Sequence, residues 1–224
     1  MELITFQTWG AFQELISKEY LVTNPQYINV LKSKKVYEWI IRKMDEKIKD
    51  KPKGASYPLW AWVQYGKRQC PPKHKTLGYF APNEDILVKI TFHKNEEELL
   101  LTNFNLFSFL LNNRYIPINK KEYLQFEKRL KENNITYDDL KAYMRPDKFL
   151  NHRQDKEYMQ IIKEIQKSFD LILNPGKDRI QACFWKLNVS DIIQVEFIHR
   201  KDCVPRNYKV GRNYINEYIH KLTD

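Results

Sequence analysis

The chain has 224 residues, with 38 lysines and arginines against 28 aspartates and glutamates, which gives a formal charge of +10. Hydrophobic residues make up 42% and aromatic residues 14%, enough to build a core, so wholesale disorder is excluded. Six glycines and ten prolines exclude a collagen-like or linker-like chain. This length predicts a single domain over residues 1–224.

The positive charge favours anionic partners such as RNA, DNA or nucleotides, although a solvated lysine-rich surface would explain it as well. The N-terminus has no basic segment followed by an apolar one, and no apolar run approaches the roughly 20 residues of a membrane helix. We therefore expect a cytoplasmic protein that does not associate with membranes. Three widely spaced cysteines, Cys70, Cys183 and Cys203, favour free thiols over disulfides or a zinc site.

The first half of the chain is predicted to mix strands and helices. Residues 2–6 suit a short strand, and Thr8 is the expected N-cap of the helix that follows. The other elements predicted here are a helix at 27–49, strands at 57–65 and 86–92, and a basic loop at 66–84.

The second half changes character at about residue 117. Residues 117–170 are polar, rich in Lys and Glu, and helical in pattern, and we interpret them as an insertion because they are too polar to hold a large core. The remaining elements are a short helix at 106–113, strands at 180–187 and 192–198, and a C-terminal helix at 210–222. This order predicts an α+β fold with a mainly antiparallel central sheet.

The widespread catalytic and nucleotide-binding motifs are absent. The sequence has no P-loop, no dinucleotide-binding glycine motif, no HExxH and no GxSxG. Its five histidines are scattered without metal-ligand spacing, so no metal site is predicted.

An aromatic strand, YPLWAW, is the first candidate for a site. Trp60 and Trp62 are two residues apart, so on a strand both point to one face, while Tyr57 and Leu59 point to the other. Two indoles on one face can stack on a base or a nicotinamide, or they can fill a core.

Polar residues at strand ends are the second candidate. Gln7 and Thr8 end the first strand, where they could grip a ligand, unless Thr8 only caps a helix. Gln181 begins a later strand and shares a face with Cys183 and Trp185. A buried amide needs hydrogen-bond partners, which makes Gln181 a better site candidate than a surface glutamine.

Basic residues with interleaved tyrosines form the third candidate, which suits single-stranded nucleic acid because cations contact phosphates and rings stack on bases. Exposed basic loops also serve solubility alone. The basic residues are Lys67, Arg68, Lys73, Lys75, Arg200, Lys201, Arg206, Lys209 and Arg212.

These pieces resemble a bacterial family known as domain of unknown function 3841. The resemblance is carried by ITFQT, YEWI, YPLWAW, ILVKITF with ELLLTNFNLFSFLLN, and IQACFWKLNVSDIIQVEFI, and it leaves out the helical stretch between the last two. The family usually has an aspartate where this chain has Asn103, so no role that needs a carboxylate carries over to that position.

That family is in turn remotely similar to ADP-ribosyltransferase toxins that modify nucleic acid. Their Gln-Ala-Glu strand carries the catalytic acid, and the corresponding run here is Gln181-Ala182-Cys183. The resemblance implies either that Asp178 or Glu196 replaces the missing acid, or that Gln181 orients the substrate without an acid. It also implies NAD as cofactor, with Gln7 and Thr8 as the first-strand grip and Tyr57, Trp60 and Trp62 as stacking rings.

The resemblance thus predicts an NAD-dependent ADP-ribosyltransferase that modifies nucleic acid, RNA rather than DNA, in a toxin–antitoxin or phage-defence system. An antitoxin protein would be its partner. The alternative is a non-catalytic module on the same fold that binds nucleic acid or protein.

Overall fold

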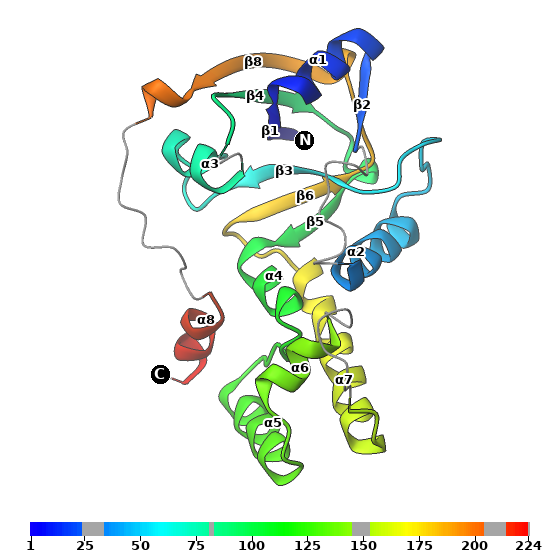
Figure 1. Cartoon of the computed structure of the whole chain (residues 1–224), viewed down its shortest axis with the longest axis vertical. Coiled ribbons are helices and arrows are strands. Elements are labelled where there is room, and N and C mark those ends of the chain that lie inside the picture. Colours follow the sequence, from blue (N-terminus) through cyan, green and yellow to red (C-terminus); the bar gives the residue numbers. More distant parts are fainter. Residues whose placement is uncertain (24–33, 81–82, 145–152, 204–213, 224) are drawn as a thin grey trace. The chain divides into compact units, whose positions relative to one another are not determined.

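Figure 1 shows the computed structural model of the chain, which describes residues 1–23, 34–80, 83–144, 153–203 and 214–223. The chain divides into two compact units. The first unit comprises Met1–Ile28, Ile40–Thr102 and Gly176–Val210, and the second comprises Asn29–Trp39, Asn103–Pro175 and Gly211–Asp224. The α+β class with a mainly antiparallel sheet is confirmed, while the single-domain organisation stays a prediction.

The first unit contains a six-stranded sheet in the order β5-β6-β3-β1-β4-β8 and a two-stranded sheet of β2 and β7, as far as the described residues go. Each pairing of β1 with β3, β1 with β4, β3 with β6, β4 with β8 and β2 with β7 is antiparallel. The strands are β1 (Glu2–Thr8), β2 (Tyr20–Val22), β3 (Leu59–Gln64), β4 (Ile86–His93), β5 (Leu100–Asn103), β6 (Ile180–Phe184), β7 (Lys186–Asn188) and β8 (Ile192–His199).

Helices cover both faces of this sheet. On one face, Leu15 of α1 (Trp9–Lys18) joins Val88 and Ile90 in the main core cluster. On the other face, Leu77 of α3 (Lys73–Phe80) packs with Leu87. We call these the α1 face and the α3 face. Because neighbouring residues of a strand point to opposite faces, the register of each strand assigns its side chains to one of them.

Two predictions for the first unit need correction. Residues 66–84 were expected to form a loop, but they contain α3, an eight-residue helix held by burial of Leu77 rather than by a long periodic pattern. The predicted strand 180–187 is divided into β6 and β7 at Trp185. The short strands β2 and β5 were not predicted. The described part of the predicted helix 27–49 is α2 (Lys34–Lys47).

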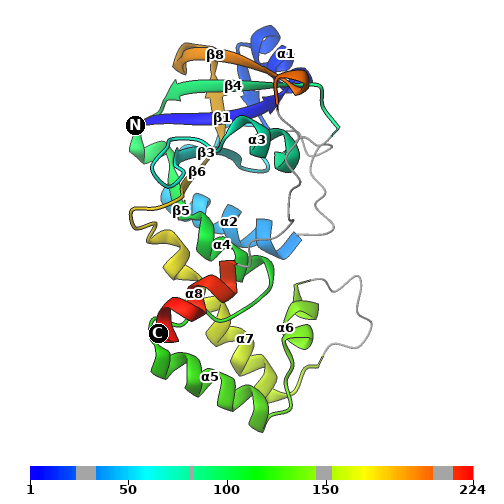
Figure 2. The ribbon, with the colours of Figure 1, turned by 90° about the vertical axis from the view of Figure 1, so that its left-hand side faces the viewer.

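The second unit is helical (Figure 2). It contains α4 (Phe104–Leu111), α5 (Lys120–Glu132), α6 (Tyr137–Tyr143), α7 (Lys156–Ser168) and α8 (Tyr214–Thr223). Asn103 caps α4 by accepting hydrogen bonds from the backbone of Asn105 and Leu106. No helix in the described ranges has both the length and the apolar character that a bilayer-spanning helix requires.

Candidate functional site

The α3 face brings together four residues that the sequence singled out. Trp60 lies opposite Cys183, and Trp62 lies opposite Gln181, in the antiparallel register of β3 and β6. Trp62 also lies opposite Ile4 of β1. Because alternate residues of a strand share a face, Ile4 is on the same face as Phe6, which packs against the cluster that contains Leu77 of α3. The prediction that both tryptophans share a face is therefore confirmed.

These four residues differ in accessibility. Trp60 is half-buried, while Trp62 and Gln181 are 3% and 6% exposed. Cys183 is completely buried, and this burial raises the pKa of its thiol well above the usual value. A buried neutral thiol cannot stabilise a developing positive charge, so Cys183 cannot replace the carboxylate that the expected transferase chemistry requires.

A cluster of rings and cations adjoins Trp62. We define the Tyr65 cluster as Trp62, Tyr65, Lys75 and Arg179. The rings of Trp62 and Tyr65 meet edge to face with centroids 5.1 Å apart. The Arg179 guanidinium lies 5.1 Å from the centroid of the Tyr65 ring, and the Lys75 ammonium lies 5.7 Å from it and 3.4 Å from the Tyr65 hydroxyl. One further aromatic ring and two cations therefore surround the half-buried ring of Tyr65.

Asp178 lies beside this cluster. Its side chain is exposed, and its Oδ1 atom is 3.6 Å from the position that a Cβ atom would take at Gly66. Gly66 follows Tyr65 directly, and Arg179 follows Asp178. Among the predicted acids, Asp178 is therefore the one placed next to the Tyr65 cluster.

Glu196 lies on the same face but far along the sheet. Its carboxylate pairs with Lys73 of α3 at 2.5 Å and with Lys89 of β4 at 3.1 Å. The hydrogen bond from Lys73, followed by the contacts with Lys89, lowers the pKa of Glu196. Four inter-strand spacings of about 4.8 Å separate β8 from β6, or about 19 Å in all. The structure does not bring Glu196 to Gln181.

The two residues expected to hold a ligand at the end of the first strand, Gln7 and Thr8, have different roles in the structure. Gln7 lies opposite Val88 on the α1 face, and its amide donates a hydrogen bond to the Thr5 hydroxyl at 2.8 Å. Thr8 accepts a hydrogen bond from the Ala11 amide at 3.2 Å, so its role as a helix cap is confirmed. Tyr57 precedes β3 and is half-buried. Gln7 therefore lies on the face opposite to Trp60 and Trp62, and Thr8 serves as the cap of α1.

The predicted basic residues fall into three groups. Lys73 and Lys75 are on α3, and Lys67 and Arg68 are exposed in the segment before it. Arg200 and Lys201 belong to a short 3-10 helix (Arg200–Asp202) after β8, and Arg200 pairs with Asp85 at 3.6 Å. The adjacent Cys203 packs against the cluster of Leu77, Leu87 and Ile198, to which α3 contributes Leu77. Arg206, Lys209 and Arg212 lie outside the described residues.

Two cations of this face were missed. Lys89 interrupts the apolar run of β4, which is a visible signal, but its pairing with Glu196 depends on a register that the sequence does not reveal. Arg179 adopts a left-handed backbone conformation with φ of 51°, which is uncommon for a residue with a Cβ atom. Its approach to Tyr65 depends on the antiparallel alignment of β3 and β6.

Comparison with protein families gives one match, to the family described as domain of unknown function DUF3841, over residues 2–193. The chain belongs to this family. The match spans β1 through the start of β8, including β3, α3 and β6 of the α3 face. It also covers the helical stretch that the sequence resemblance left out, so that limit of the resemblance was wrong. No curated protein and no solved structure matches the chain. Within the described ranges, no three His, Cys, Asp or Glu side chains are grouped so that they could hold a metal ion.

Proposed function

We propose that the protein binds single-stranded nucleic acid, RNA rather than DNA, through the α3 face. The observation that carries this proposal is the Tyr65 cluster, in which one ring is flanked by the cations of Lys75 and Arg179. A base stacks on the ring while neighbouring phosphates contact the two cations, which is the pairing of groups that single-strand binders use.

The charges around the cluster support the proposal. Lys73 and Lys89 share one carboxylate, that of Glu196, so this trio keeps a net charge of +1. Lys67 and Arg68 add exposed positive charge in the segment that leads into α3. A phosphate backbone that follows α3 from the Tyr65 cluster therefore meets positive groups along its path, and this attraction weakens with salt.

Binding is tested with a fluorescein-labelled 12-nucleotide RNA, the matching DNA and an RNA duplex, measured by fluorescence anisotropy. We expect the single-stranded RNA to bind most tightly and Tyr65→Leu to weaken binding by about 1–3 kcal/mol, the usual value of one stacked base. Lys121→Gln/Lys221→Gln removes two exposed lysines of the second unit as a charge-loss control. Equal binding by Tyr65→Leu and the natural protein contradicts the proposal.

We propose NAD-dependent ADP-ribosyl transfer to the bound strand as the second candidate function. The observation that favours it is the exposed Asp178 carboxylate beside the Tyr65 cluster, in the turn that leads into β6 and Gln181. This acid has no ion pair with another described residue. In a toxin–antitoxin or phage-defence system, such a transferase would need a protein that neutralises it.

The two candidates are separated by incubating the protein with labelled NAD and RNA. Transfer that is abolished by Asp178→Asn, while RNA affinity is retained, supports the transferase. Glu196→Gln is the matched control, because it also removes one carboxylate but about 19 Å from Gln181. Absence of label on RNA, DNA and protein, with RNA binding intact, leaves the binding function alone.

A further inference from the structure

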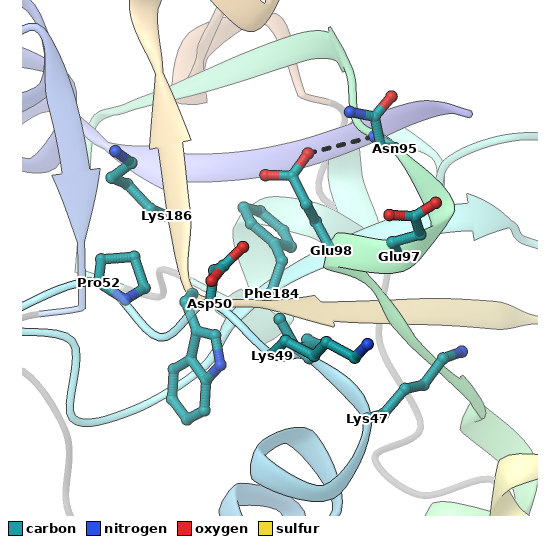
Figure 3. Close-up of a pocket in the computed structure, with 11 residues that line it drawn as sticks. Lys47, Lys49, Asp50, Pro52, Asn95, Glu97, Glu98, Phe184 and Lys186 are labelled. Carbon is teal, nitrogen blue, oxygen red and sulfur yellow. Dashed lines mark hydrogen bonds between the residues drawn. The ribbon is translucent and has the colours of Figure 1, made fainter.

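A cavity of about 570 Å³ lies in the first unit, lined by residues that the proposed function does not use. It is lined by the last residue of α2 with the segment that follows (residues 47–50 and Pro52), by the segment before β5 and by the junction of β6 with β7. Figure 3 shows Lys47, Lys49 and Lys186 around it together with the carboxylates of Asp50 and Glu97. The volume falls in the range of small-molecule sites.

The charges in this cavity are of two kinds. Glu98 and Asp191 share the buried ammonium of Lys94, which lies 2.9 Å from each carboxylate, so this trio keeps a net charge of −1. Glu98 also accepts a hydrogen bond from the backbone amide of Asn95. The ammonium groups of Lys47, Lys49 and Lys186 form no ion pair with any other described side chain. The same holds for the carboxylates of Asp50 and Glu97, again within the described part of the chain. Three cations and two carboxylates therefore share one cavity without pairing.

This combination selects a ligand that carries both an anion and hydrogen-bond donors. Ammonium groups bind phosphate as point charges, and carboxylates accept hydrogen bonds from neighbouring sugar hydroxyls. A simple anion satisfies only the lysines and is repelled by Asp50 and Glu97. A simple sugar satisfies only the carboxylates. A phosphorylated sugar satisfies both sets at once.

We propose that this cavity binds a sugar phosphate, either free or as the ribose 5′-phosphate part of a nucleotide. The site is distinct from the Tyr65 cluster, because its lining comes from the end of β6 and from segments outside α3. Binding at the cavity does not require the protein to bind RNA or to transfer ADP-ribose.

Trp185 provides a local reporter. It lines the cavity, it is 2% exposed, and its indole N–H has no hydrogen-bond partner within the described residues. The Lys51 ammonium lies 4.2 Å from the centroid of its ring. The chain has five tryptophans, so a ¹⁵N spectrum has five indole signals, and Trp185→Phe assigns one of them.

The experiment titrates ribose 5-phosphate, AMP, ribose and inorganic phosphate, using the Trp185 indole signal and calorimetry. We expect ribose 5-phosphate to bind at least about tenfold more tightly than ribose or phosphate, because charge-assisted and neutral hydrogen bonds add. AMP binding more tightly than ribose 5-phosphate assigns the nucleotide as the source, and equal or weaker binding assigns the free sugar phosphate. Ribose 5-phosphate binding no more tightly than phosphate overturns the proposal.

Two variants test the two sets of charges. Lys47→Gln/Lys49→Gln/Lys186→Gln should lower the affinity for ribose 5-phosphate by about tenfold or more, since it removes every unpaired cation of the cavity. Asp50→Asn/Glu97→Gln should weaken ribose 5-phosphate severalfold while phosphate binds equally or more tightly, because repulsion is removed.

The control is Lys121→Gln/Lys167→Gln/Lys221→Gln, which removes the same charge from exposed positions of the second unit. All variants are first checked for unchanged thermal unfolding. RNA affinity at the Tyr65 cluster should be unchanged in the Asp50→Asn/Glu97→Gln variant. Equal losses in the control and cavity lysine variants, or tighter ribose 5-phosphate binding after loss of the carboxylates, overturn the proposal.

Discussion

Removing the two cations of the Tyr65 cluster should change the salt dependence of RNA binding by a calculable amount. Each phosphate neutralised on a single strand contributes about −0.7 to the slope of log affinity against log salt. Lys75 and Arg179 flank Tyr65, so two phosphate contacts are counted. Lys75→Gln/Arg179→Gln should therefore reduce the slope by about 1.4.

The assay is fluorescence anisotropy of the labelled 12-nucleotide RNA at 50, 100 and 200 mM salt. The two contacts account for about a sevenfold fall in affinity over this fourfold range, and the double variant should lose that part of the fall. Lys121→Gln/Lys221→Gln removes the same charge elsewhere and should leave the slope within error. A slope unchanged in the double variant, or reduced equally by the control, refutes the reasoning that assigns phosphate contacts to this cluster.

Three further predictions concern stability and reactivity. Thr8→Ala should lower the free energy of unfolding by about 1 kcal/mol in urea denaturation, because the Ala11 amide loses its cap, whereas Thr8→Ser should retain most of it. The folded pKa of Glu196 lies below its ordinary value of 4.5, so its ion pairs stabilise fully above pH 4.5 and lose this effect as the pH falls through the lower folded pKa. At pH 7 the natural protein should have a higher free energy of unfolding than Glu196→Gln, by at most about 1 kcal/mol because the ion pairs are partly exposed. This difference, followed by thermal unfolding, should disappear in acid. Cys183 should remain unmodified by iodoacetamide at pH 8 until the protein unfolds, because only the thiolate reacts and burial raises the pKa of the Cys183 thiol. Mass spectrometry measures the modification, and alkylation of Cys183 in the folded protein would contradict the prediction.

The sequence was sufficient to predict elements whose pattern is local. The apolar run of β4, the cap at Thr8 and the face shared by Trp60 and Trp62 depend only on neighbouring residues. α3 was missed because a helix with a single buried leucine, Leu77, has no periodic stripe, and only its packing against the sheet stabilises it. The end of β6 at Trp185 was likewise hidden within a continuous apolar segment.

The candidate site was harder to predict because it depends on strand order. The resemblance implied that Asp178 or Glu196 takes the place of the missing acid next to Gln181, but β6 and β8 are separated by three other strands. The same order brings Lys89 to Glu196 and Arg179 to Tyr65, neither of which follows from spacing along the chain. Alternation within a strand is visible in a sequence, whereas adjacency between strands is set by tertiary pairing.

The burial of Cys183 bears directly on whether the proposed ADP-ribosyl transfer could use an acid at this position of the sheet. Cys183→Glu would place a carboxylate at a site with no exposed surface, facing Trp60 across the β3–β6 ladder. We expect this variant to lose about 3–5 kcal/mol of unfolding free energy in urea denaturation, since a buried charge without a partner is costly. Cys183→Ser controls for the loss of the thiol, and Asp178→Glu, at an exposed position, should be nearly neutral. If Cys183→Glu is as stable as the natural protein, the position is open to solvent or to a polar partner, and the argument that moves the acid to Asp178 fails.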